Sequence, residues 1–146
     1  AYLGDVGESP TGDKKAQHFE DAYRDELFAA LPALGFQAVT YMPPRNTVDQ
    51  LKRVQALAAR HGLLEISGVD INSSRQSFRC PEVLQPEFRH LRESTWALVG
   101  HEIATAEDVD RGLFREAGPG AGKPLGERIA VYAELGKKQT PSGTEV

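Results

Sequence analysis

The sequence predicts an α/β fold in which parallel strands are joined by crossover helices and followed by a more helical carboxyl-terminal portion. Two observations lead to this fold class. In the first half, short runs rich in β-branched and aromatic residues alternate with longer segments whose apolar residues have helical spacing. The connections between these segments are short, which favours right-handed crossovers and a parallel sheet. We therefore expect one α/β domain over residues 1–136 and a disordered tail over residues 137–146.

Residues 1–6 begin this alternation as a short strand, and a helix is predicted from Lys14 to about Leu31. Gly35 is the expected stop after that helix. The helix is predicted because apolar side chains recur at four-residue steps, at Phe19, Tyr23, Leu27 and Leu31. The face expected to be solvated carries His18, Glu20, Asp21, Arg24 and Asp25.

Residues 36–42 (FQAVTYM) form the clearest predicted strand, which a pair of prolines ends. Thr47, with Gln50 three residues later, is a capping box that begins the next helix, and Gly62 closes that helix. Residues 63–69 (LLEISGV) are the third predicted strand. The apolar face of the intervening helix is predicted to consist of Leu51, Val54, Leu57 and Ala58.

The second half is predicted to be mainly helical. The second of its helices is expected to begin at a capping box formed by Thr105 and Asp108. The glycine-rich residues 118–122 follow a helix and do not match a phosphate-binding loop, so we interpret them as a hinge or linker. The predicted helices cover residues 86–99, 105–115 and 125–135.

The composition narrows the classes of partner. The 17 basic and 21 acidic residues are interspersed and the formal net charge is −4, so nucleic acid is not an expected partner. No apolar run approaches the roughly 18 residues needed to cross a bilayer, and no membrane partner is expected. Cys80 is the only cysteine, which excludes an intramolecular disulfide and favours a reducing, cytoplasmic location.

Polar residues follow each predicted strand. The carboxyl ends of parallel strands meet at one edge of a sheet, where ligands bind. We therefore expect these loops to meet at that edge, which we call the mouth. Carboxylates there would bind a divalent cation, and arginines would bind an oxyanion such as phosphate. Metal-assisted phosphoester chemistry needs both. The candidates are Asp5 after the first strand, Arg45 and Asn46 after the second, and Asp70, Asn72, Arg75 and Arg79 after the third.

A structural interpretation of the same residues stays open. Asp and Asn after a strand are common turn formers and helix caps, and arginines often lie solvated on a surface. Among the four histidines, His101 follows an apolar stretch and is the candidate acid, base or metal ligand, with a structural role as the alternative. No two histidines have the spacing of a recognisable zinc motif.

Residues 35–43 and 45–47, followed by residues 66–72 (ISGVDIN), resemble the carboxyl-terminal part of a metal-dependent phosphoesterase of the polymerase and histidinol phosphatase (PHP) superfamily. The resemblance covers roughly residues 1–102. It implies a distorted seven-stranded β/α barrel, of which this chain would hold the later part, and hydrolysis of a small phosphorylated substrate by metal-bound hydroxide. It also implies a divalent cofactor, Mn, Zn or Fe.

The family's late strand ends in Asp-x-His, and both residues bind metal. Asp70 matches that aspartate, whereas Asn72 stands where the histidine is expected, and the chain has no early His-x-His pair. The resemblance therefore implies an incomplete site. Three interpretations follow: a hydrolase fragment that lacks its amino-terminal half, an anion-binding module that uses arginines without turnover, and a half barrel that self-associates to complete its sheet. The start of the chain at Ala1, inside a predicted strand, favours a fragment.

Overall fold

The computed structural model describes residues 2–7, 16–69, 71, 74–75 and 79–138. These residues belong to two compact units, Ala1–Phe88 and Arg89–Val146, where the sequence predicts a single domain. The first unit contains a two-stranded parallel sheet and two α-helices, and the second unit is helical. The mixed α/β class is confirmed, whereas no barrel is evident in the described ranges.

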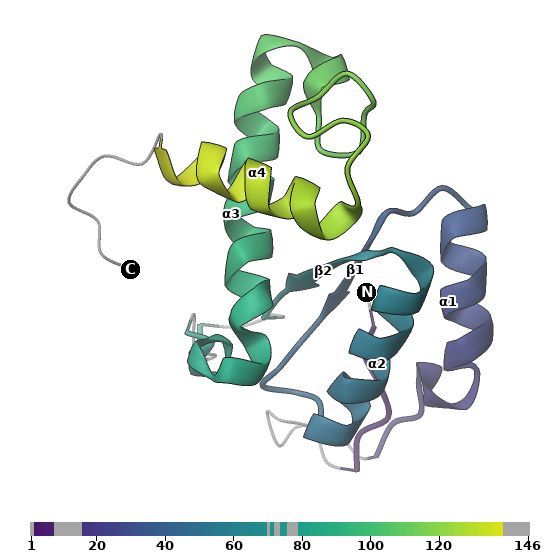
Figure 1. Ribbon diagram of the computed structural model, residues 1–146. Helices are drawn as coiled ribbons and strands as arrows, with labels where there is room; N and C mark the ends of the chain where they lie inside the picture. The colour runs from purple at the N-terminus through teal and green to yellow at the C-terminus, as the bar shows by residue number, and fades with distance from the viewer. Residues whose placement is uncertain (1, 8–15, 70, 72–73, 76–78, 139–146) are drawn as a thin grey trace. The chain divides into compact units, whose positions relative to one another are not determined.

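The sheet of the first unit is a βαβ arrangement. Strand β1 (Ala38–Tyr41) pairs in parallel with β2 (Leu64–Ser67), with Ala38 opposite Leu64 and Tyr41 opposite Ser67. Helix α2 (Val48–His61) joins them, and α1 (Arg24–Ala33) lies beside α2 (Figure 1). The predicted parallel pairing and crossover helix are confirmed.

Both ends of α2 are as the sequence predicts. The Thr47 hydroxyl accepts the amide N–H of Gln50, and the Gln50 side chain accepts the amide N–H of Thr47. Gly62 follows the helix with φ of 65°, a left-handed conformation that glycine adopts without a steric penalty. The predicted apolar face is buried: Leu51, Val54, Leu57 and Ala58.

The amino-terminal segment is extended but forms no regular strand. The Tyr2 amide donates to the Thr40 carbonyl oxygen at 2.7 Å, so the segment runs beside β1, and Val6 forms an isolated antiparallel bridge with Gln17. Between these points, the amides of Leu3 and Gly4 donate to the Glu20 carboxylate. Side-chain oxygens thus replace the ladder that the predicted strand 1–6 would have formed.

Helix α1 begins later than predicted. A short 3-10 turn, η1 (Glu20–Ala22), precedes it, and α1 itself starts at Arg24. The predicted apolar stripe is wrong, because Tyr23 is 51 % exposed while Phe28 is fully buried. The prediction that Arg24 lies on the solvated face is also wrong, because its side chain is buried. Residues 14–15 of the predicted helix lie outside the described residues.

Two further 3-10 turns, η2 (Pro81–Leu84) and η3 (Pro86–Phe88), end the first unit. The second unit then begins with α3 (Arg89–Glu107), followed by η4 (Val109–Arg111) and α4 (Leu125–Lys138). The predicted helix 105–115 is wrong, because Thr105 lies inside α3 and donates from its hydroxyl to the His101 carbonyl oxygen at 2.9 Å. Helix α4 continues through Lys138, and residues 139–146 of the expected tail lie outside the described part.

Helices α3 and α4 cross at a contact between glycines (Figure 1). A Cβ atom added at Gly100 would lie 1.9 Å from the Tyr132 carbonyl oxygen, and one at Gly136 would lie 2.3 Å from the Trp96 carbonyl oxygen. The two backbones therefore approach to a distance that only glycine permits. Within the described ranges, no helix has the length and apolar character needed to cross a membrane.

Candidate functional site

Asp21 is the centre of a hydrogen-bonded cluster in the first unit. Its carboxylate accepts from the Asp5 amide at 2.9 Å and from Gln50 Nε2 at 2.7 Å. It also accepts from the Tyr2 hydroxyl and the Arg24 guanidinium. Burial raises the pKa of Asp21, but the hydrogen bonds from Tyr2, Gln50 and the Asp5 amide outweigh it and leave this pKa below its ordinary value. Four donors occupy this carboxylate, so its role is structural.

Two amide side chains, Asn46 just before α2 and Gln50 in its first turn, fix the amino-terminal segment. Asn46 Nδ2 donates to the Leu3 carbonyl oxygen and Gln50 Nε2 donates to the Asp5 carbonyl oxygen, each at 2.7 Å. Gly4 has φ of 67°, and a Cβ atom there would lie 2.7 Å from Asn46 Nδ2. Asn46, predicted to bind substrate, is buried and its amide nitrogen is used inside the protein. It therefore positions the segment that carries Asp5.

Asp5 forms a pair with His18. One carboxylate oxygen of Asp5 lies 2.8 Å from His18 Nδ1, and the other accepts the Phe19 amide at 2.7 Å. The hydrogen bonds from His18 and from the Phe19 amide lower the pKa of Asp5. The side chain of Asp5 is 32 % exposed and that of His18 is 90 % exposed. The Asp5–His18 pair therefore lies at the protein surface, and hydrogen bonds hold Asp5 in position.

Arg45 lies beside this pair through Phe19. The Arg45 guanidinium carbon is 5.1 Å from the centre of the Phe19 ring, a cation–π contact. Since Phe19 also donates its amide N–H to Asp5, the structure brings the predicted residues Asp5 and Arg45 into one neighbourhood. Among the described residues, Arg45 Nε is buried and has no hydrogen-bond partner.

The third predicted loop is described only in part. Asp70 and Asn72, the candidate metal ligands after β2, lie outside the described residues. Arg75 and Arg79 are exposed. The described part of the chain contains no group of three or more His, Cys, Asp or Glu side chains arranged to hold a metal ion. Asp5 and His18 are a carboxylate and an imidazole that the described part of the chain brings into contact at the amino-terminal segment.

His101, the predicted catalytic histidine, belongs to the second unit. Its Nδ1 accepts the Leu113 amide N–H at 3.0 Å, so the imidazole joins α3 to the segment after η4. A Cβ atom at Gly112 would lie 2.9 Å from His101 Cε1, which shows how closely the chain wraps the ring. These contacts give His101 a structural function in the helical unit.

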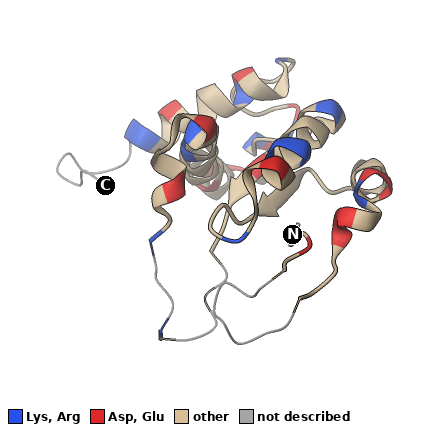
Figure 2. Ribbon diagram, turned by 90° about the horizontal axis from the view of Figure 1, so that it is seen from below, with Lys and Arg blue, Asp and Glu red and all other residues tan. Residues whose placement is uncertain are grey.

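Basic and acidic residues alternate along the described helices. In Figure 2, Lys and Arg are interspersed with Asp and Glu along the helices.

Cys80, in the first unit, is partly buried. Burial and the Glu82 carboxylate raise the pKa of its thiol, which keeps the thiol protonated and makes it a poor nucleophile.

No protein-family model, curated protein or solved structure matches the chain.

Sequence reasoning missed His18 as a partner of Asp5 and missed the central position of Asp21. Both residues fall on the face of the first predicted helix that we expected to be solvated. No local pattern indicates their contacts with Asp5, because these contacts span 13 and 16 residues of the chain.

Proposed function

We propose that this chain carries part of the active site of a PHP-type metal-dependent phosphoesterase, with β1 and β2 as later strands of a β/α barrel. The observation that carries the proposal is the grouping of a carboxylate, an imidazole and a guanidinium around Phe19, supplied by Asp5, His18 and Arg45. The Asp70-Ile71-Asn72 motif after β2 supports the same reaction class.

The donor set suits a divalent transition metal. Mn, Zn and Fe all accept mixed imidazole and carboxylate ligands, which are the groups that the Asp5–His18 pair presents. Asp70 and Asn72 would complete the set of ligands. When bound, the ion would polarise the phosphoester and generate hydroxide at neutral pH.

The arginines would hold the phosphoryl oxygens. Arg45 is the best placed of them, because its guanidinium is fixed against the ring of Phe19. A planar guanidinium matches the geometry of a phosphate oxygen pair. Arg75 and Arg79, on the loop after β2, would add positive charge at the same mouth.

The proposal is tested by isothermal titration of Mn²⁺ into the wild-type chain and into Asp70→Ala. We expect Asp70→Ala to weaken Mn²⁺ binding at least about tenfold, because it removes a charged ligand. Asp110→Ala, on η4 of the second unit, is the matched control and should bind Mn²⁺ like the wild type. Equal affinities of Asp70→Ala and the wild type would show that the proposal is wrong.

A non-catalytic anion-binding module is the second candidate, favoured by the guanidinium of Arg45, which is held against the ring of Phe19. This module would bind inorganic phosphate without any metal, and Arg45→Lys would weaken that binding because lysine lacks the planar fork. Phosphate binding that needs no metal, together with unchanged Mn²⁺ binding in Asp70→Ala, would favour the module over the phosphoesterase.

A further inference from the structure

We infer that His101 is a pH-sensitive switch in the second unit: the neutral imidazole holds residues 112–118 against α3, and its protonation in mild acid releases them. The inference goes beyond the proposed function and does not depend on it. It begins with a single hydrogen bond, in which the Leu113 amide nitrogen lies 3.0 Å from His101 Nδ1.

The donor in this hydrogen bond is known from its chemistry. A backbone amide N–H can only donate, so Nδ1 of His101 must accept through its lone pair. The imidazole in this contact is therefore neutral and carries its hydrogen on Nε2. A protonated imidazole has a hydrogen on both nitrogens and cannot accept, so protonation would place two donors face to face. The bond to Leu113 exists only while His101 is neutral.

Residues 112–118 are packed closely around this bond, beside the carboxyl-terminal half of α3 (Figure 1). The Leu113 side chain is fully buried. A Cβ atom at Gly112 would lie 3.2 Å from His101 Nδ1, and one at Gly118 would lie 2.7 Å from the Arg111 carbonyl oxygen. Because the contacts are this close, the protonated ring and the Leu113 amide can separate only if the backbone of residues 112–118 moves.

Two side chains of α4 hold the same stretch of backbone, and mild acid affects neither. The Tyr132 hydroxyl donates to the Arg111 carbonyl oxygen, and Arg128 Nη2 donates to the Arg115 carbonyl oxygen at 2.8 Å. Burial raises the pKa of Tyr132, which keeps its hydroxyl protonated, and a guanidinium stays charged. Of these three side chains, His101 is the one whose type changes charge near neutral pH.

The charged groups on the elements around His101 are paired or exposed. The paired groups are Arg111 with Glu107, Lys123 with Glu127, and Asp108 with the amide N–H of Asp110. The exposed side chains are those of Glu102, Asp110, Arg115 and Glu116. Carboxyl groups ordinarily titrate near pH 4 and histidines near pH 6.5. A scan between about pH 7.5 and pH 5.5 therefore tests the imidazole rather than these carboxylates.

The test is nuclear magnetic resonance of the ¹⁵N-labelled wild-type chain. At about pH 7.5 the imidazole nitrogens of His101 should report the Nε2–H tautomer; an Nδ1–H tautomer would overturn the inference. As acid protonates the ring, the hydrogen-exchange protection factor of the Leu113 amide should fall at least about tenfold, while amides in the middle of α3 and α4 keep theirs. Protection of Leu113 that ignores ring protonation, or that falls together with α3 and α4, would also overturn it.

His101→Asn separates the proton from the contact. The asparagine Oδ1 occupies the same position along the side chain as Nδ1 and accepts a hydrogen bond without titrating, so Leu113 should stay protected in the same acid. His90→Asn is the matched control: His90 lies in the first turn of α3, about three turns from His101, and Leu113 should respond to acid as in the wild type. An equal loss of Leu113 protection in His101→Asn and the wild type would show that His101 is not the switch.

Discussion

The amide N–H of Asp5 donates a hydrogen bond to the carboxylate of Asp21 at 2.9 Å, across 16 residues of sequence. Gln50 Nε2 joins the same two residues, because it donates to the Asp5 carbonyl oxygen and to the Asp21 carboxylate. This link holds the amino-terminal segment beside β1 and the start of α2. The position of the Asp5–His18 pair depends on it.

Replacement of Asp21 by alanine should destabilise the first unit strongly. The substitution leaves the Tyr2 hydroxyl, the Arg24 guanidinium and Gln50 Nε2 without their shared acceptor. Removal of one partner from a buried charged pair costs about 3–5 kcal/mol, and the lower end applies because Asp21 is not fully buried. We expect a loss of about 3 kcal/mol in urea unfolding.

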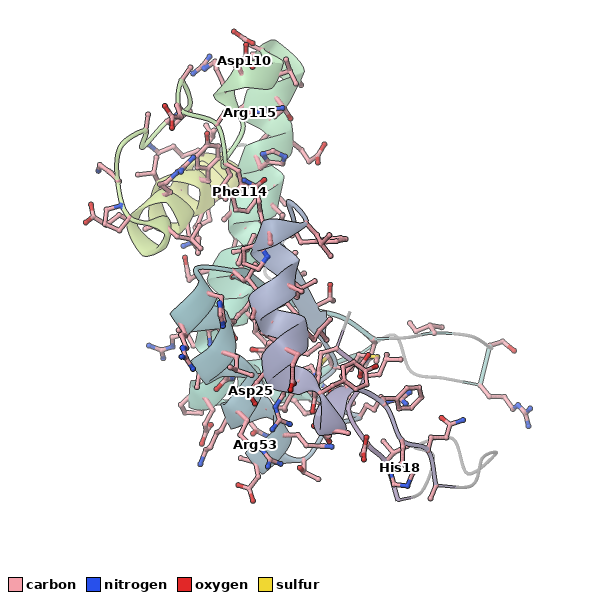
Figure 3. All side chains as sticks on the ribbon, turned by 90° about the vertical axis from the view of Figure 1, so that its right-hand side faces the viewer. His18, Asp25, Arg53, Asp110, Phe114 and Arg115 are labelled. Carbon is pink, nitrogen blue, oxygen red and sulfur yellow. The ribbon has the colours of Figure 1, made fainter. Side chains whose placement is uncertain are left out.

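Asp25→Ala is the control for this substitution. Asp25 is exposed on the first turn of α1 (Figure 3), so its removal should cost less than about 1 kcal/mol. Equal losses of unfolding free energy in the two variants would contradict the central role assigned to Asp21.

Acid should destabilise the protein through Asp5 and Asp21. The folded state lowers both pKa values below the ordinary 3.8, so the unfolded chain binds protons at a higher pH than the folded chain does. The stabilisation is present above pH about 4 and is lost as the pH falls through the folded pKa values. Urea unfolding between pH 6 and pH 2.5 should show this fall, and Asp21→Asn should flatten it. A fall of equal steepness in Asp21→Asn would be contrary to expectation.

Two glycine substitutions in the second unit should have opposite effects. Gly100→Ala places a methyl group 1.9 Å from a backbone oxygen of α4, so overpacking of about 1–3 kcal/mol should exceed any gain in helix propensity. Gly126→Ala, in the first turn of α4, meets no atom within 4 Å and should stabilise by up to about 1 kcal/mol. The midpoints of thermal unfolding should move in opposite directions; a common direction would disprove the close helix contact.

Thr47→Ala should cost about 1 kcal/mol, because it removes the side-chain acceptor for the Gln50 amide at the start of α2. Thr47→Ser keeps the hydroxyl and should retain most of that stability. Urea unfolding of the two variants measures the difference. If serine and alanine were equally destabilising, the loss would come from packing of the threonine methyl group rather than from the cap.

The sequence predicts the elements whose signals are local. The Thr47–Gln50 capping box, the stop at Gly62 and the β-rich runs around them are each contained within a few residues, so α2, β1 and β2 follow from the chain itself. The parallel pairing follows in turn from the length of the crossover.

The elements that the sequence does not predict are those set by distant contacts. Before the start of α1, the Glu20 carboxylate binds the amides of Leu3 and Gly4, and this distant contact leaves no pattern near residue 20. The sequence predicts that Asp5 and Arg45 lie close together at the mouth, and in the structure both residues contact Phe19. Their convergence with Asp70 stays a prediction.

Paramagnetic line broadening by Mn²⁺ tests the shared mouth most directly. A ¹⁵N-labelled chain receives substoichiometric Mn²⁺, and the loss of amide signal intensity is mapped along the sequence. A single ion held by the proposed residues should broaden the amides of Asp5, His18, Arg45 and Asp70 first. Broadening that reaches Asp70 but spares Asp5 and His18 would contradict the proposed site.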